Sequence, residues 1–112
     1  MTRLRIAVVG VGHLGRLHAT LLSKRSDVEL AAVVDASAEQ AAAVAGACGA
    51  ASFPTVEPLL GHIDAAIIAT PTRYHAAVAA PLIEAGVHLL IEKPLAATAD
   101  EAALLVGAAR RR

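Results

Sequence analysis

The sequence predicts an α/β fold in which helices cover both faces of a doubly wound parallel sheet. Short apolar runs without polar alternation recur along the chain, as is typical of strands buried on both faces, and helical signals separate them. Hydrophobic residues make up 56% of the sequence but aromatic residues only 2%, so small aliphatic side chains must form the core. Right-handed crossovers favour about five strands in the order 3-2-1-4-5. At 112 residues the chain is expected to be one domain, residues 1–112.

A glycine-rich turn joins the first predicted strand to the first predicted helix. The apolar run Ile6–Val9 predicts the strand, and leucines at helical spacing predict the helix over residues 13–24. Here stand Gly10, Gly12 and Gly15, in the spacing G-x-G-x-x-G, which in this context indicates a dinucleotide-binding turn. Gly10 allows the tight turn, Gly12 lets a pyrophosphate approach the backbone, and Gly15 lets the helix lie close to the sheet. The N–H groups at the helix N-terminus then hold the phosphate charge.

An acidic residue follows the second predicted strand. The apolar run Leu30–Val34 ends in Asp35, which stands 20 residues after Gly15. A carboxylate at this place binds the ribose hydroxyls of the adenosine and repels a 2′-phosphate. The alternative is that Asp35 only begins a turn before Ser37. No arginine occurs between Asp35 and Ala51, so the sequence predicts NAD rather than NADP.

The remaining elements are predicted from capping and turn signals. Ser37 and Gln40 form a predicted capping box that opens a second helix, which ends in the Gly46–Gly49 region. After it the sequence predicts a strand over 51–53, a short helix or turn over 55–60, a strand over 65–69, a helix over 74–85, a strand over 87–91 and a last helix from a second capping box at Thr98 to about Ala109. Pro81 is expected to bend or shorten the helix over 74–85.

Further stretches of the sequence resemble one known family. They are ATPTRYH at 69–75, EAGVH at 84–88 and EKPLA at 92–96. Together with the glycine motif and Asp35 they resemble the glucose–fructose oxidoreductase/inositol dehydrogenase (Gfo/Idh/MocA) family over essentially the whole chain. GVGHLGRLHA at 10–19 resembles its sugar-nucleotide branch. The resemblance implies the Rossmann domain of a nicotinamide-dependent dehydrogenase that acts on sugars, cyclitols or sugar nucleotides.

The resemblance also implies site residues. Lys93 would lie near the nicotinamide and the substrate hydroxyl as the catalytic residue, where a lysine can exchange a proton with the reacting oxygen. The ring of His75 either contacts the cofactor or caps and packs its helix. The predicted cofactor-binding residues are Gly10, Val11, Gly12, His13, Leu14, Gly15, Asp35, Thr70, Pro71, Thr72, His75, Glu92 and Lys93.

Several classes of site and partner are not expected. Ten acidic and ten basic residues balance, without aromatic–basic interleaving, so nucleic acid is not an expected partner. No pair among the five histidines has metal-ligand spacing with a nearby acid, and Cys48 is alone, so neither a metal site nor a disulfide is expected. No apolar run reaches the ~20 residues of a membrane span, and Met1 leads directly into the first strand. We therefore expect a cytoplasmic protein without membrane contact.

The family has a second, substrate-binding domain, and nothing in this sequence corresponds to it. One interpretation is the cofactor-binding half of an oxidoreductase, which alone would bind cofactor without turnover. The second is a stand-alone NAD-binding module or subunit, such as a sensor, with no catalysis of its own. The third is a Rossmann remnant without a ligand. Besides the dinucleotide, the expected partners are a second copy of the chain or a separate substrate-domain subunit, because the strand over 87–91 or the last helix is expected to expose apolar surface.

Overall fold

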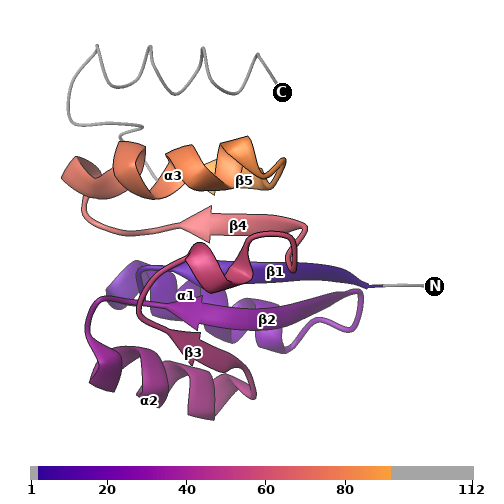
Figure 1. Ribbon diagram of the computed structural model, residues 1–112. Helices are drawn as coiled ribbons and strands as arrows, with labels where there is room; N and C mark the ends of the chain where they lie inside the picture. The colour runs from indigo at the N-terminus through magenta and orange to yellow at the C-terminus, as the bar shows by residue number, and fades with distance from the viewer. Residues whose placement is uncertain (1–2, 92–112) are drawn as a thin grey trace.

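The computed structural model describes residues 3–91, which form a single five-stranded sheet with helices on both faces (Figure 1). The elements are β1 Leu4–Val9, α1 His13–Ser23, β2 Val28–Val34, α2 Ala38–Cys48, β3 Ala51–Phe53, the 3₁₀ turn η1 Glu57–Leu59, β4 Ala65–Ile68, the 3₁₀ turn η2 Thr72–Tyr74, α3 His75–Glu84 and β5 His88–Ile91. The last predicted helix and its capping box lie outside the described residues.

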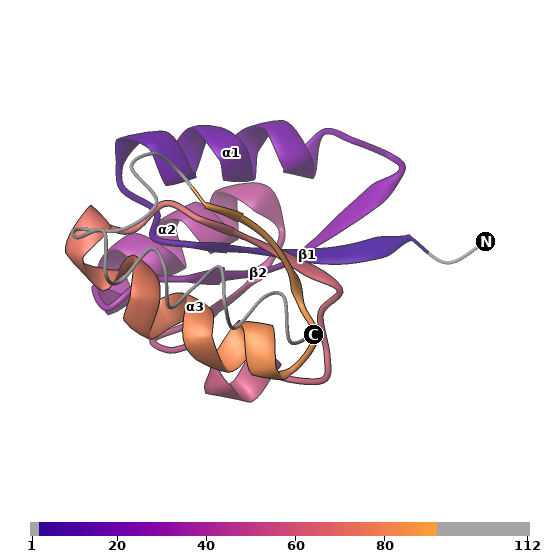
Figure 2. The same ribbon diagram turned by 90° about the horizontal axis from the view of Figure 1, so that it is seen from above.

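The strand order is β3-β2-β1-β4-β5, and every neighbouring pair is parallel. This confirms the predicted fold class and strand order. Figure 2 shows α1 and α3 on opposite sides of the sheet. The direction of the crossovers changes at β1, because the chain moves outward from β1 through β2 to β3 and then returns to β4 on the other side.

Two apolar cores lie on the two faces of the sheet. In β1, Ala7 and Val9 face the core under η1 and α3, whereas Val8 faces the core under α1 and α2. All three are buried, with at most 3% of their surface exposed. A strand that is covered on both sides has no place for polar residues, which explains why the strands of this chain are continuous apolar runs.

Helix α1 packs on the sheet through its smallest residues. Its buried positions are Gly15 and Ala19, and Leu22 is partly buried against the same core. Leu14, Leu17 and Leu21 instead lie on the outer side, with 43%, 50% and 55% of their surface exposed. The leucine spacing therefore predicts the helix correctly but does not identify its buried face, because the helix lies too close to the sheet there for large side chains.

The start of α2 differs from the predicted capping box. The Ser37 hydroxyl accepts the backbone N–H of Gln40 at 3.3 Å, as predicted. The Gln40 side chain does not return to the backbone N–H of Ser37, which donates instead to Asp35 Oδ1 at 2.8 Å. The carboxylate is the stronger acceptor, so it takes this N–H and leaves the Gln40 carboxamide available for another contact.

Helix α3 continues through Pro81 to Glu84, so the prediction that this proline shortens the helix is wrong. The proline removes one backbone donor, but the residues after it stay in the helical turn. Leu82 and Ile83 bury their side chains in the core, and the backbone N–H of Ala85 donates to the Pro81 carbonyl at 3.1 Å. Burial of the last turn therefore offsets the lost hydrogen bond.

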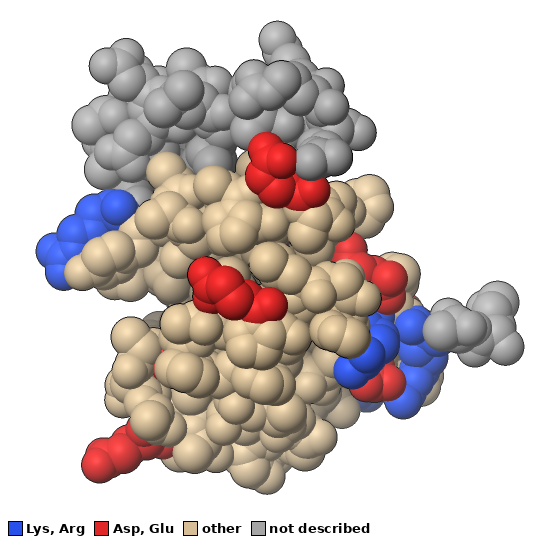
Figure 3. Space-filling model, in the orientation of Figure 1, with Lys and Arg blue, Asp and Glu red and all other residues tan. Residues whose placement is uncertain are grey.

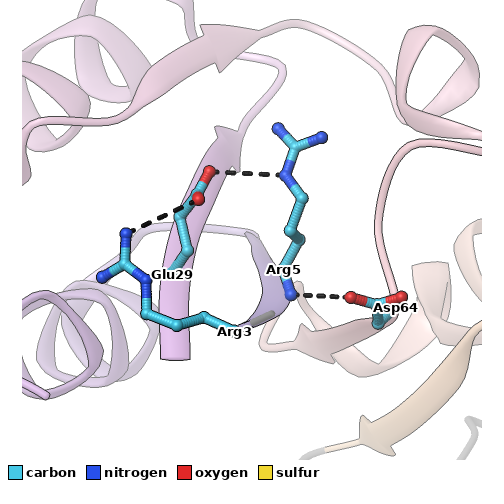
Figure 4. Close-up of polar contacts among 4 residues, drawn as sticks. All are labelled: Arg3, Arg5, Glu29 and Asp64. Atoms are coloured by element: carbon cyan, nitrogen blue, oxygen red, sulfur yellow. Dashed lines mark hydrogen bonds and ion pairs between the residues drawn. The ribbon is translucent and has the colours of Figure 1, made fainter. Parts of the chain in front are cut away.

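Charged side chains gather where β1 begins, at the edge opposite the glycine turn (Figure 4). Arg3 and Arg5 both contact the Glu29 carboxylate, with N–O distances of 3.7 and 3.3 Å. The Asp64 carboxylate accepts the backbone N–H of Arg5 at 2.8 Å. The ion pairs are exposed and stabilise the fold little, but Asp64 joins the start of β4 to β1. Within residues 3–91, no helix has the length and apolar character needed to cross a membrane.

Candidate dinucleotide site

A cleft of about 860 Å³ opens at the carboxyl edge of the sheet. Val9, Val34 and Ala69 line it at the ends of β1, β2 and β4, and residues of η1 and α3 line its side. The strand order changes direction here, which is where open α/β sheets bind their ligands. The space-filling view looks onto the face that η1 and α3 cover; most of its residues are uncharged, Asp and Glu are scattered over it, and Lys and Arg lie at its margins (Figure 3).

The three glycines of the turn differ in whether the fold itself requires a glycine at that position. Gly10 has a positive φ of +87°, and a Cβ there would lie 2.6 Å from the backbone nitrogen of Thr70. A Cβ on Gly15 would lie 1.7 Å from the Gly10 carbonyl oxygen. These two glycines are therefore required by the fold, as the sequence predicts for a tight turn and for a helix close to the sheet.

The fold itself does not require a glycine at position 12. A Cβ there would meet no atom within 4 Å, and its φ of −68° is available to any residue. Gly12 lines the cleft and is the N-cap of α1, and no side chain caps this helix. The first N–H groups of α1, those of His13, Leu14 and Gly15, have no acceptor within the helix. The turn thus leaves a concave space in front of N–H donors that have no acceptor within α1.

The carboxylate of Asp35 joins the second strand to the glycine turn. Its Oδ2 accepts the backbone N–H of Val11 at 2.9 Å and the Nε2–H of Gln40 at 3.0 Å. Its Oδ1 accepts the backbone N–H of Ser37 at 2.8 Å. Both functions considered for Asp35 are therefore structurally compatible: it starts the turn before α2, and it also lines the cleft.

The segment after β4 forms the opposite wall. Thr70 and Pro71 line the cleft, and Thr72 begins the η2 turn. The hydroxyl oxygen of Thr70 is buried and has no hydrogen-bond partner among the described residues. A buried hydroxyl without a partner costs free energy in the folded chain, so Thr70 carries a polar group whose hydrogen bond no described residue supplies.

The ring of His75 lies beneath this segment rather than in the cleft. Only 1% of its surface is exposed, and its Nε2 is 2.8 Å from the Thr70 carbonyl oxygen. A carbonyl can only accept, so Nε2 carries the proton and donates. Of the two functions considered for His75, the structure supports packing and positioning of the Thr70 loop.

The predicted cofactor residues and the residues that line the cleft do not coincide completely. Glu92 and Lys93 lie outside the described residues. Gln40, Tyr74 and Pro81 line the cleft, although the sequence indicated only structural functions for the segments that hold them. The signal for Gln40 was present, because the third residue of a helix lies beside the residues that precede its N-cap. The described residues contain no group of His, Cys, Asp and Glu side chains that could hold a metal ion.

A protein-family model described as an oxidoreductase family with an NAD-binding Rossmann fold, GFO_IDH_MocA, matches residues 4–112. The chain belongs to the Gfo/Idh/MocA family. This confirms the resemblance that the sequence motifs carry, and it makes a dinucleotide the ligand class of the domain. Three expected parts of a dinucleotide site line the cleft of this chain. They are the glycine turn, the acidic residue after β2 and the polar loop after β4.

Curated relatives of the chain are dehydrogenases named for different substrates. The chain is 47% identical, over its full length, to UDP-N-acetylglucosamine 3-dehydrogenase of Acidithiobacillus ferrooxidans, of which it covers 35%. It is 36% identical over 107 residues to inositol 2-dehydrogenase of Corynebacterium glutamicum, covering 92% of this chain and 32% of that enzyme. The chain thus spans about a third of the length of the curated relatives that it matches.

Solved structures of family members have the same fold. GenD2 from gentamicin A biosynthesis, in complex with NAD, superposes with a TM-score of 0.92 at 34% identity, covering 99% of this chain and 32% of that chain. The A. ferrooxidans enzyme GnnA superposes with a TM-score of 0.89 at 46% identity, covering 99% of this chain and 36% of that chain. The similarity includes nearly the whole of the present chain and only the corresponding third of the longer proteins.

Proposed function

We propose that this chain binds NAD(H) in the cleft as the cofactor domain of an oxidoreductase. The open space over Gly12 carries this proposal. The fold does not need a glycine there, and a side chain would fill the space in front of the α1 N-terminus. A pyrophosphate fits this place, because N–H donors and the positive end of the helix dipole favour an anion. The hydroxyl of Thr70, buried and without a partner on the opposite wall, is a second feature that a bound ligand would explain.

When bound, the nicotinamide ring supplies the hydride chemistry, and the residues of the chain bind and orient the dinucleotide. The first turn of α1 would hold the pyrophosphate, and Asp35 would accept hydrogen bonds from the adenine ribose. Thr70 and Pro71 would contact the other half of the cofactor. Lys93, by its place in the Glu-Lys-Pro element, would exchange a proton with the substrate oxygen.

We further propose that the preferred cofactor is NAD rather than NADP. A 2′-phosphate would come close to the negative carboxylate of Asp35, and no arginine between Asp35 and Ala51 is available to neutralise it. The proposed substrate class is a sugar nucleotide or related sugar. The 47% identity to UDP-N-acetylglucosamine 3-dehydrogenase supports this class.

Turnover requires groups that hold the substrate, and the relatives are about three times as long as this chain. We propose that a second domain or subunit supplies these groups, and that residues 1–112 alone bind cofactor without appreciable catalysis. The other candidate is a cofactor-binding module with no catalysis of its own. Both candidates share the NAD site, so NAD binding is tested first.

The test compares two glycines that both have free space. Gly46 in α2, like Gly12, has no atom within 4 Å of an added Cβ and no positive φ. Gly12→Val and Gly46→Val are therefore both expected to fold. Calorimetric titration with NAD should show binding to the wild-type chain and to Gly46→Val, and loss of binding in Gly12→Val. Normal NAD affinity in Gly12→Val would show that the phosphate site lies elsewhere.

A further inference from the structure

We propose that Gln40 is a specificity-determining residue of the cofactor site, which positions the Asp35 carboxylate and supplies a second acceptor for the adenine ribose. This inference rests on the proposed binding of NAD. It begins from the hydrogen bonds that the Asp35 carboxylate already makes within the chain.

The Asp35 carboxylate has little acceptor capacity left. A carboxylate offers about four lone-pair positions, two on each oxygen. The backbone N–H of Val11 and the Nε2–H of Gln40 take both positions on Oδ2, and the backbone N–H of Ser37 takes one on Oδ1. One position on Oδ1 remains. A ribose presents two neighbouring hydroxyls, so Asp35 in this conformation can accept only one of them.

The carboxamide of Gln40 is placed to accept the other hydroxyl. The partner of Gln40 is an ionised carboxylate, which can only accept, so the atom at 3.0 Å must be the NH₂ group. The carbonyl oxygen Oε1 is then the polar atom of the side chain left for a ligand. Gln40 is half-buried and lines the same cleft as Asp35 and Gly12. Asp35 and Gln40 together therefore offer two acceptors for one diol.

This pair also opposes a 2′-phosphate more strongly than the carboxylate alone. A phosphate is an acceptor without a hydroxyl proton to donate, so it would meet two acceptor oxygens and one full negative charge. Breaking the Gln40–Asp35 hydrogen bond would remove one acceptor and let the carboxylate rotate. The preference for NAD over NADP should therefore depend on Gln40 as well as on Asp35.

The test replaces Gln40 with methionine, which keeps the length and the helix propensity but has no amide. Ala43→Met is the matched control, because Ala43 is exposed on the same helix and does not line the cleft. Titrations use NAD, NADP and two NAD analogues whose adenine ribose lacks the 2′- or the 3′-hydroxyl. Thermal unfolding of each variant is measured without ligand. Gln40→Glu, which has acceptors where the amide donor stood, serves as a second variant.

In Gln40→Met we expect NAD affinity to fall about tenfold and NADP affinity to rise, so that the preference for NAD over NADP narrows by more than tenfold. Removing either ribose hydroxyl should weaken binding to the wild-type chain and to Ala43→Met. In Gln40→Met, removing the hydroxyl that Gln40 accepts should cause no further loss of affinity. Gln40→Glu should also bind NAD more weakly, since its carboxylate repels Asp35. An unchanged preference in Gln40→Met, with both analogues penalised as in the wild type, would overturn the inference and leave NAD binding in place. Failure of the wild-type chain to bind NAD would overturn the proposed function and this inference together.

Discussion

The backbone N–H of Val11 donates to the Asp35 carboxylate at 2.9 Å, and Val11 itself is completely buried. One hydrogen bond thus connects the middle of the glycine turn to the end of the neighbouring strand. Asp35, which we propose to bind the adenine ribose, therefore also holds the glycine turn, which we propose to bind the pyrophosphate. The two halves of the cleft are therefore mechanically linked.

Replacement of Asp35 tests this link. In Asp35→Ala the N–H groups of Val11 and Ser37 lose their acceptor, so the chain should lose about 1–3 kcal/mol of stability. NAD affinity should also fall, and the preference for NAD over NADP should narrow because the negative charge is gone. Urea unfolding measures the first effect and calorimetry the second. NADP bound as tightly as NAD by the wild-type chain would contradict the assigned function of Asp35.

Alanine substitutions at the glycines of the turn should change the free energy of unfolding by different amounts. Gly15→Ala places a Cβ 1.7 Å from the Gly10 carbonyl oxygen, so we expect a loss of about 3 kcal/mol in unfolding experiments. Gly12→Ala meets no atom, so it should lose only about 1 kcal/mol, because alanine is less favourable than glycine at an N-cap. Gly46→Ala, in the interior of α2, should gain about 0.5–1 kcal/mol through helix propensity and is the reference for a harmless change. A Gly15→Ala chain as stable as the wild type would show that α1 can move away from the turn.

Thr70→Val should change stability and binding in opposite directions. Valine has nearly the same shape as threonine but no hydroxyl, so it removes a buried polar group that has no partner within residues 3–91. The ligand-free variant should be more stable by about 1 kcal/mol in thermal or urea unfolding. Its affinity for NAD should be lower than that of the wild-type chain. Unchanged NAD affinity would show that the Thr70 hydroxyl does not meet the cofactor.

The 112-residue chain should not turn over a substrate on its own. Hydride transfer needs the substrate carbon held roughly 3–3.5 Å from the nicotinamide, and such positioning contributes on the order of 7–11 kcal/mol. NADH formation should be undetectable with a panel of sugars, inositols and UDP-sugars. Steady turnover that Lys93→Ala abolishes would show that the chain contains a complete catalytic site.

The strand order could be predicted from the sequence because its signals are local. Each strand is an apolar run, and the handedness of crossovers leaves few topologies for such a pattern. The positions of Gly10 and Asp35 in the fold could be predicted from the same apolar runs, because each residue directly follows one of them. The glycine turn and the acidic residue therefore lie at one cleft, as the sequence indicated.

Other features depend on distances that no local pattern contains. The buried face of α1 is set by the close approach of Gly15 to Gly10, and this approach leaves Leu14, Leu17 and Leu21 outside. The contact of Gln40 with Asp35 arises because Asp35 takes the Ser37 N–H and so leaves the glutamine amide free. Pro81 remains within α3 because the turn that follows it is buried in the core.

The contact between Gly15 and the Gly10 carbonyl also fixes the rotational phase of α1. Each residue turns an α-helix by about 100°, so a change in the length of the turn rotates the helix about its axis. One inserted residue after Gly12 would bring Leu14 to the place that faces Gly10, and one deleted residue would bring Arg16 there. Either side chain would meet the carbonyl oxygen that leaves no room for a Cβ. The number of residues between the glycines is therefore as strictly determined by the fold as the glycines themselves.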